Sequence, residues 1–128
     1  QTTVGETAAV AALAHVLVAR LAARHDEGER LPCHPTWRIE ENRWSACRHG
    51  LEGMLADLDT GESRPARERL RELLDQLEPT AALLDCRAEL ASARELTDAI
   101  GAERQREAAG ERGGAQAIAR WLVSRFTA

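Results

Sequence analysis

The feature that most constrains the fold is a helix near the start of the chain that is apolar on both faces. Thr3 and Glu6 form a capping-box pattern, which predicts a helix from about Val4 to about Arg24. One face carries large aliphatic side chains, and the opposite face is also mostly apolar, with Ala8, Ala11, His15, Val18 and Ala22. A helix that is apolar all round is usually buried on more than one side. The rest of the chain offers only amphipathic helices, so we expect this helix to pack against structure outside the chain or against another chain.

Turn residues divide the remainder into short helices and one hairpin. After a polar loop at 25–35, Thr36 is the expected N-cap of a second helix that stops at Gly50. The turn residues at 59–61 predict a small β-hairpin near 55–64. A third helix should start near Pro65 and end at Pro79. Further helices are expected at 80–85, 87–100, 102–109 and 115–127, with breaks at Gly101, Gly110 and Gly113-Gly114, so the predicted fold class is mainly α.

Composition limits the classes of partner. A length of 128 residues suits one compact domain. The net charge is −4 and no long run of one sign is present, so the chain lacks the electrostatic footprint of a nucleic-acid-binding protein. The most apolar run, 8–19, is too short to span a bilayer, so no membrane is expected. Three cysteines without framework spacing, Cys33, Cys47 and Cys86, indicate reduced thiols and a cytoplasmic location.

The segment ENRWSACRHGLEG at 41–53 is the strongest candidate for a site. All 17 basic residues of the chain are arginines, so any anion must be recognised by guanidinium groups, whose planar fork suits phosphate and carboxylate. Arg43 and Arg48 lie near the end of the second helix, before Gly50. One interpretation is an ordinary solvated face in which Trp44 stacks on Arg48 and Glu41 pairs with an arginine. The other is an anion site at a helix end.

Other reactive residues point to no site. Cys33, His34, Cys47 and His49 do not have the spacing of a zinc site, so no metal is expected in the chain. A cysteine nucleophile would need an orienting partner and an oxyanion site, and the sequence supports neither. Buried, structural positions are expected for several residues, namely Cys47, Cys86, His15 and Trp121.

NRWSACRHGLEG, followed by DLDTGESRPARE, resembles the C-terminal region of the glutamate–cysteine ligase type 2 family, the bacterial carboxylate–amine ligases. The matching positions run from Asn42 to Gly53 and continue through Asp57, Thr60, Gly61, Arg64 and Pro65. His49 stands where the family usually has tyrosine. The opening helix and the last two helices also resemble the family, so the likeness covers essentially the whole chain.

The resemblance implies a glutamine-synthetase-like α+β ligase, in which an antiparallel sheet forms a funnel with helices packed outside. It implies a reaction in which ATP and Mg²⁺ activate the γ-carboxylate of glutamate as an acyl phosphate, and cysteine or another amine attacks it to form a γ-glutamyl amide. Arg43 and Arg48 would be the catalytic residues that contact phosphate or substrate carboxylate. Asn42 would be a polar partner in substrate or phosphate binding, and Trp44 a stacking or packing residue.

The resemblance also implies that residues 1–128 are a single helical segment, the C-terminal part of a larger catalytic domain. The sheet and its metal-binding glutamates would lie upstream, in the same protein or in a companion chain, and a homodimer is plausible for this fold. The isolated chain is therefore expected to lack ligase activity. The alternative is a stand-alone helical binding or subunit module, derived from such a ligase and without catalysis of its own.

Overall fold

The computed structural model of the chain describes residues 3–112 and 114–126. The elements in chain order are α1 (Val4–Asp26), α2 (Thr36–His49), the short 3₁₀-helix η1 (Gly50–Glu52), β1 (Met54–Ala56), β2 (Ser63–Pro65), α3 (Ala66–Leu83), α4 (Arg87–Glu95), α5 (Gly101–Arg112) and α6 (Ala115–Phe126). The two strands form an antiparallel hairpin in which Leu55 pairs with Arg64. Helices make up 73% of the structure, so the predicted mainly α fold with one short hairpin is confirmed.

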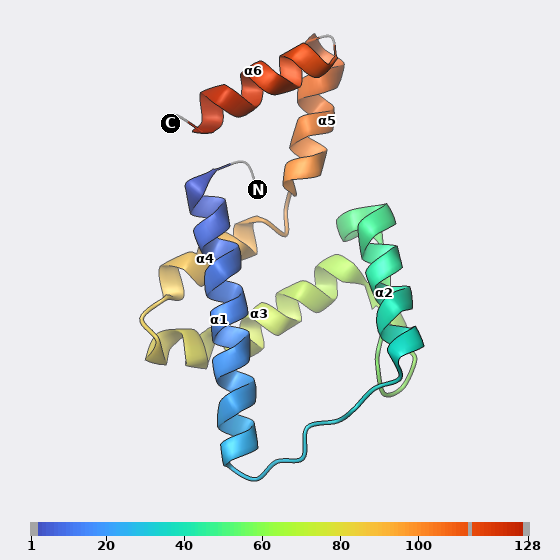
Figure 1. Cartoon of the computed structure of the whole chain (residues 1–128), viewed down its shortest axis with the longest axis vertical. Coiled ribbons are helices and arrows are strands. Elements are labelled where there is room, and N and C mark those ends of the chain that lie inside the picture. Colours follow the sequence, from blue (N-terminus) through green and yellow to red (C-terminus); the bar gives the residue numbers. More distant parts are fainter. Residues whose placement is uncertain (1–2, 113, 127–128) are drawn as a thin grey trace.

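The core lies where α1 packs against α3 and α4 (Figure 1). The helix α1 begins as predicted, because the hydroxyl of Thr3 accepts a hydrogen bond from the backbone N–H of Glu6 at 3.1 Å. Burial of aliphatic side chains, at about 25 cal/mol per Å² of apolar surface, is the main stabilising contribution here. The buried residues of this core are Ala9, Val16, Leu74, Leu77, Ala81, Leu90 and Ala93.

The described residues leave the outer face of α1 uncovered. Val18 is 64% exposed, and every other residue predicted for this face is also exposed, namely Ala8, Ala11, His15 and Ala22. The prediction that His15 is a core histidine is therefore wrong, because α3 and α4 pack only on the other side. The helix is also much longer than the apolar run 8–19: its 23 residues are long and apolar enough to cross a membrane, a test that core helices of soluble proteins also pass.

Pro79 does not end the third helix. α3 continues to Leu83 and takes in the segment predicted as a separate helix at 80–85. A proline inside a helix removes one backbone hydrogen bond and costs about 3 kcal/mol. Leu77 and Ala81, on either side of it, are fully buried, while Pro79 itself is exposed. Burial of these neighbours offsets the cost of the proline, which lies on the solvent side of the helix.

Several predicted boundaries shift. Pro35, with φ −60° and ψ 130°, is the N-cap of α2, so the prediction of Thr36 as the cap is wrong, while Gly50 ends the helix as predicted with φ 59°. α4 stops at Glu95 rather than near residue 100. Gly101 is the first residue of α5, directly after the break between α4 and α5, whereas Gly110 lies inside α5 instead of ending it. Gly113 lies outside the described residues, whereas Gly114, with φ 88°, does form the turn before α6.

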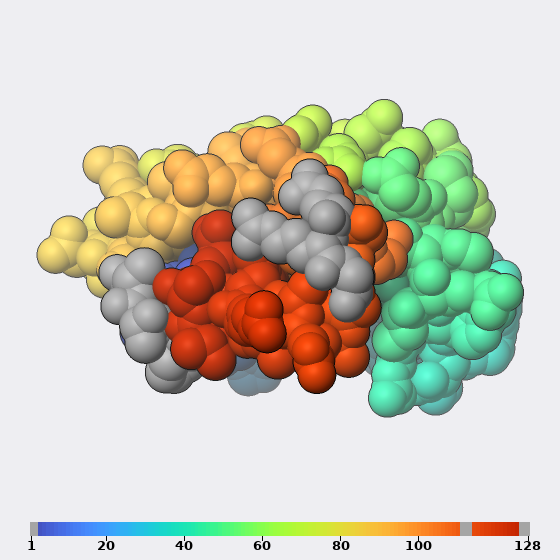
Figure 2. Space-filling model, turned by 90° about the horizontal axis from the view of Figure 1, so that it is seen from above, coloured from blue at the N-terminus to red at the C-terminus, as the bar shows by residue number. Residues whose placement is uncertain are grey.

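The last two helices pack on each other at one end of the molecule, near the start of α1 (Figures 1 and 2). An ion pair between Arg104 of α5 and Glu6 of α1 ties them to the body. Trp121 of α6 is half-buried rather than part of the core, and the guanidinium of Arg125 lies 5.4 Å from its ring centre. Seen from this end, α2 lies along one side of the molecule (Figure 2, right).

Candidate functional site

The helix α2 is attached to the hairpin by polar side chains. The guanidinium of Arg38 donates to the backbone carbonyl of Leu58 at 2.7 Å. One turn later, the amide of Asn42 donates to the carbonyl of Ala56 at 2.8 Å and accepts from the N–H of the same residue at 2.7 Å. The hydroxyl of Ser45 then donates to the carbonyl of Met54 at 2.7 Å. We call Arg38, Asn42 and Ser45 the polar ladder of α2.

Asn42 and Ser45 of the polar ladder use the edge of β1 that β2 leaves open, while Arg38 reaches the turn that follows β1. In an antiparallel pair, the backbone groups of successive residues point alternately to the two sides of the strand. Leu55 pairs with Arg64 of β2, and the backbone N–H of Asp57 donates to the backbone carbonyl of Glu62 at 2.7 Å. The carbonyls of Met54 and Ala56, in contrast, point toward α2. Side chains of α2 therefore satisfy backbone groups that another strand would otherwise bind.

Two glycines permit this close approach. A Cβ on Gly53 would lie 3.0 Å from the hydroxyl of Ser45 and 3.1 Å from its carbonyl, tighter than ordinary contacts. Gly50 has a positive φ of 59°, and a Cβ there would lie 3.0 Å from Ile100. The fold thus accounts for both glycines of the 41–53 segment, because a residue without a Cβ lets the end of α2 turn tightly onto β1.

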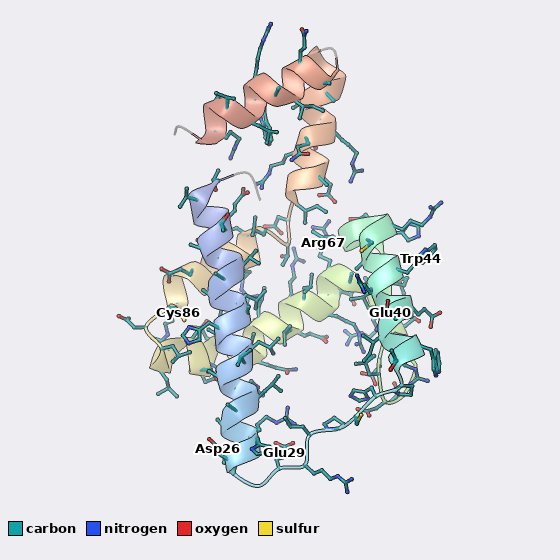
Figure 3. The ribbon with its side chains drawn as sticks, viewed as in Figure 1. Asp26, Glu29, Glu40, Trp44, Arg67 and Cys86 are labelled. Carbon is teal, nitrogen blue, oxygen red and sulfur yellow. The ribbon has the colours of Figure 1, made fainter. Side chains whose placement is uncertain are left out.

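The outer side of α2 carries an exposed cluster of Trp44, Arg48 and His49. The guanidinium of Arg48 lies 5.7 Å from the ring centre of Trp44, within the range of a cation–π contact. The ring of His49 meets Trp44 edge-on, with centroids 5.8 Å apart. Trp44 is 61% exposed and lies on the side of α2 away from α3 (Figure 3). Among the described residues, Arg48 has no carboxylate partner.

Arg43 lies apart from this cluster. Arg48 follows Arg43 by five positions, which corresponds to about 140° around a helix. Its guanidinium pairs with Glu40, one turn back, at 3.4 Å, and both side chains are more than half exposed. The structure therefore brings Trp44 and Arg48 together, as the sequence predicted, but directs the two arginines to different sides of α2. Cys47 is exposed as well, so its predicted burial is wrong, while Cys86 is half-buried.

The hairpin turn is organised by Asp57. Its carboxylate accepts from the backbone N–H groups of Asp59 and Thr60, at 3.0 and 2.8 Å, and from the guanidinium of Arg69 at 2.8 Å. The hydrogen bond from the Thr60 backbone, followed by that from Arg69, holds the pKa of Asp57 far below its ordinary value. Asp57 therefore stays ionised and fixes both the turn and its attachment to α3.

Further arginines of the same region serve the fold. Arg64 forms a bidentate pair with Glu72, which raises the pKa of the guanidinium and lowers that of the carboxylate. Arg67 donates to Glu52 of η1 at 2.7 Å and also to the backbone carbonyls of Thr97 and Asp98. Sequence reasoning missed Arg67, because its partners lie 15 to 31 residues away and no local spacing reveals them.

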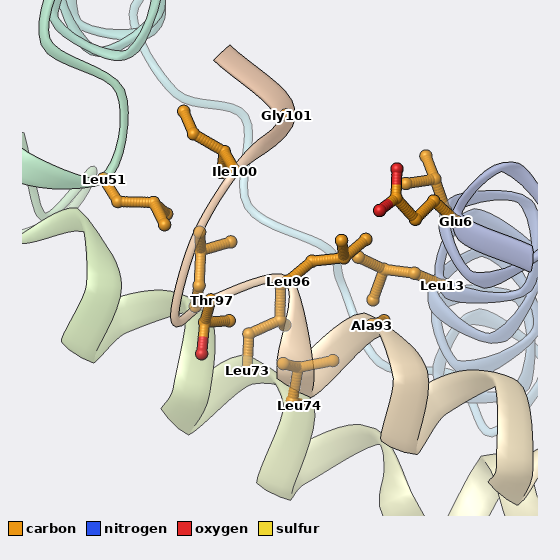
Figure 4. Close-up of a pocket in the computed structure, with 12 residues that line it drawn as sticks. Glu6, Leu13, Leu51, Leu73, Leu74, Ala93, Leu96, Thr97, Ile100 and Gly101 are labelled. Carbon is orange, nitrogen blue, oxygen red and sulfur yellow. The ribbon is translucent and has the colours of Figure 1, made fainter. Parts of the chain in front are cut away.

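An apolar cavity of about 260 Å³ opens between α1, α3 and α4 (Figure 4). Its two polar side chains already have protein partners: Glu6 is paired with Arg104, and the hydroxyl of Thr97 donates to the carbonyl of Arg94. The cavity therefore presents no convergent polar groups to a substrate. The remaining lining is Val10, Leu13, Leu51, Leu70, Leu73, Leu74, Ala93, Leu96, Ile100 and Gly101.

Comparison with known proteins identifies the family. The family model described as "Glutamate-cysteine ligase family 2 (GCS2)" matches residues 1–119, which include the polar ladder, the Trp44 cluster and the hairpin. The chain belongs to glutamate-cysteine ligase family 2. The resemblance inferred from the 42–53 segment and the following turn is thereby confirmed.

Individual relatives in glutamate-cysteine ligase family 2 are substantially longer than this chain. The chain is 42% identical over 113 residues to the "Putative glutamate--cysteine ligase 2-1" of Mycolicibacterium smegmatis, covering 87% of this chain and 30% of that protein. It is 38% identical over 113 residues to the protein of the same name from Arthrobacter sp. (strain FB24), with 88% and 30% covered. A "Putative glutamate--cysteine ligase 2" from Clavibacter sepedonicus is 39% identical over 105 residues. The chain thus spans about 30% of the length of the first two relatives.

The acidic, histidine and cysteine side chains of this member of glutamate-cysteine ligase family 2 are scattered over the described residues. Within residues 3–112 and 114–126, no group of three or more histidine, cysteine or acidic side chains is placed to hold a metal ion. His34 approaches a single carboxylate, that of Asp59, at 3.5 Å. What this part of the chain offers is exposed guanidinium groups.

Proposed function

We propose that the chain is the C-terminal helical part of an ATP-dependent carboxylate–amine ligase that joins glutamate to cysteine or another amine through an acyl phosphate. The family supports a ligase of the glutamate–cysteine type. The observation that carries the site assignment is that the exposed guanidinium of Arg48 has no carboxylate partner among the described residues, because its stacking on Trp44 would also occur on an ordinary solvated face. An exposed guanidinium stacked on an aromatic ring, without a carboxylate partner in the described part of the chain, is suited to bind an anion.

The reaction requires positive charge where an anion develops. Transfer of a phosphoryl group spreads negative charge over the equatorial oxygens, and positioned cations stabilise this charge. Arg48 would contact the transferring phosphoryl group or a substrate carboxylate, with Trp44 holding the guanidinium plane. Arg43, on the other side of α2, would contact a different anionic group of the same reactants.

ATP and Mg²⁺ would be bound by the complete enzyme. The described residues lack a cluster of oxygen ligands, so the metal would be held by residues outside this chain. This chain would supply guanidinium groups to one side of the site. The isolated 128-residue chain is accordingly expected to be inactive.

The remaining part of the ligase would cover the outer face of α1. Exposed residues of this face are mostly apolar, and contiguous apolar surfaces commonly mark interaction sites. We assign this face to the upstream sheet of the same protein or of a companion chain, with a homodimer as a further arrangement of the complete enzyme. A cytoplasmic location is consistent with the free thiols of Cys33 and Cys47.

The exposed face of α1 is also the observation that favours a second function. A stand-alone helical module would use the same face to bind a partner chain, without catalysis of its own. The two functions differ in the contribution of Arg48 to turnover. In the complete protein, Arg48→Ala should lower kcat for release of ADP in the presence of glutamate and cysteine if the chain is part of the catalytic domain. Unchanged kcat and KM in Arg48→Ala and Arg43→Ala would contradict the site assignment.

A further inference from the structure

The attachment of α2 differs from that of the core helices. No residue of α2 is buried, whereas α1 buries two aliphatic side chains and α3 buries four. Apolar packing is non-directional, so it constrains the rotation of a helix only loosely. Hydrogen bonds have defined distances and angles and fix orientation more tightly. The direction in which α2 presents its outer side therefore depends on the polar ladder.

We propose that Asn42 is a positioning residue, which fixes the rotation and the register of α2 on β1 and thereby places Arg48 and Trp44. This inference rests on the proposed function, because it concerns the same arginine. It reassigns Asn42, for which the family resemblance implied a role as a polar partner in substrate or phosphate binding. Both polar atoms of its amide are engaged by Ala56, at 2.8 and 2.7 Å, so the side chain has its partners within the fold.

Asn42 holds register more strictly than the other two members of the ladder. It is part-buried and both donates to and accepts from one residue, so it recognises the N–H and the C=O of Ala56 together. Leu55, one position away, faces β2, and a slip of one residue would therefore leave the amide of Asn42 without partners. Ser45 makes one exposed hydrogen bond, and Arg38 reaches its carbonyls through a long, flexible side chain.

The geometry links Asn42 to Arg48 through the helix. Six residues separate them, which is about 240° around the axis and about 9 Å along it. Asn42 thus does not touch the cluster, and it can influence Arg48 only by turning or shifting α2 as a unit. A small rotation of the helix carries the guanidinium at the end of a long side chain by a larger distance, and catalytic contacts are sensitive to shifts of about 1 Å.

The chain offers a nearly isosteric variant. Asn42→Asp keeps an acceptor for the N–H of Ala56 but loses the donor to its carbonyl and places a carboxylate oxygen beside that carbonyl. Asn42→Ala removes both hydrogen bonds. Gln116→Glu, on the exposed part of α6, makes the same change from amide to acid away from the ladder and serves as the matched control.

The test is a double-mutant cycle in the complete enzyme, with kcat and KM measured for ATP, glutamate and cysteine. We expect Asn42→Asp to lower kcat about tenfold or more, and Gln116→Glu to leave it unchanged. In a background that carries both Arg43→Ala and Arg48→Ala, Asn42→Asp should lower kcat by less than about twofold, because the arginines that α2 presents are already absent. A merely structural role would lower kcat by the same factor in both backgrounds, and this result would overturn the inference.

A second variant covers the case in which Asn42→Asp does not fold. Ser45→Ala removes one exposed bond of the ladder and should show a smaller loss of kcat with the same dependence on Arg48. A loss of kcat in Ser45→Ala that is equally large with and without the arginines of α2 would then overturn the inference. The results also distinguish failure of the role of Asn42 from failure of the site at Arg48. A slow Arg48→Ala enzyme together with normal turnover in Asn42→Asp contradicts only the positioning role. Normal turnover in Arg48→Ala contradicts the proposed site itself, and the positioning role with it.

Discussion

The carboxylate of Asp57 accepts a hydrogen bond from Arg69 at 2.8 Å, which joins the hairpin turn to α3. Because the same carboxylate also holds the backbone of Thr60, its pKa in the folded protein lies far below the ordinary value. This contribution to stability is present at pH values above the unfolded pKa of Asp57, near 4. It is lost as the pH falls toward the depressed folded pKa.

Replacement of Asp57 should accordingly lower stability at neutral pH. We predict that Asp57→Asn lowers the free energy of unfolding at pH 7, and that the difference from wild type shrinks as the pH is lowered below 4. Denaturant unfolding at several pH values measures this. Asp85→Asn is the control, because Asp85 is exposed with φ 54°, a conformation that asparagine adopts readily. Equal effects of the two substitutions would contradict the role of Asp57.

Leu77 and Leu83 belong to the same helix, α3, but differ in burial. Leu77 is fully buried, while Leu83 is 87% exposed. We predict that Leu77→Ala lowers the free energy of unfolding by about 2–5 kcal/mol, through lost transfer energy and the cavity left behind. Leu83→Ala should change it by less than about 0.5 kcal/mol. Chemical denaturation measures both, and similar losses would show that α3 is packed differently.

Replacement of Pro79 should raise the free energy of unfolding instead of lowering it. It interrupts the hydrogen bonds of α3 on an exposed turn, so Pro79→Ala should restore one backbone bond and raise the free energy of unfolding by about 1 kcal/mol or more. Pro35→Ala is the control, because Pro35 is the N-cap of α2 and interrupts no helix. A loss of stability in Pro79→Ala would mean that the proline has a favourable contact outside the described residues.

The outer face of α1 can be tested in the complete protein. Val16 is fully buried and Val18 is 64% exposed in this structure. If the rest of the ligase covers this face, Val18→Glu should destabilise the complete protein by several kcal/mol, because a charge would be buried there. Thermal unfolding compares it with Val4→Glu, near the start of α1. No change in the melting temperature of Val18→Glu would indicate that this face stays in solvent.

Local chemistry made much of the fold predictable. The Thr3 cap, the hairpin and the stop at Gly50 each depend on residues within a few positions, so their patterns are visible in the sequence. The exposed His15 was not predictable, because an all-apolar helix does not reveal which side its neighbours cover. Pro79 inside α3 follows from burial of Leu77 and Ala81, which is a tertiary effect.

The candidate site was predictable to a lesser extent. The spacing of Trp44 and Arg48 placed them on one side of α2, where the structure has them in contact. The role of Asn42 could not be read from the sequence, because its partner Ala56 lies 14 residues away and belongs to a strand of three residues. The contacts of Arg67 with Glu52 and with Thr97, just after α4, could not be predicted either, because these partners are also distant in the sequence.

Arg48 is proposed to act on the reacting anion. The most direct measurement is steady-state turnover of the complete enzyme, with ATP, glutamate and cysteine, for Arg48→Ala and Arg48→Lys. Loss of a positioned donor of this kind costs about 10²–10³ in kcat. We predict that Arg48→Ala loses this much, and that Arg48→Lys recovers only part of it, because an ammonium lacks the planar fork. Wild-type kcat and KM in Arg48→Ala, with the fold intact, would contradict it.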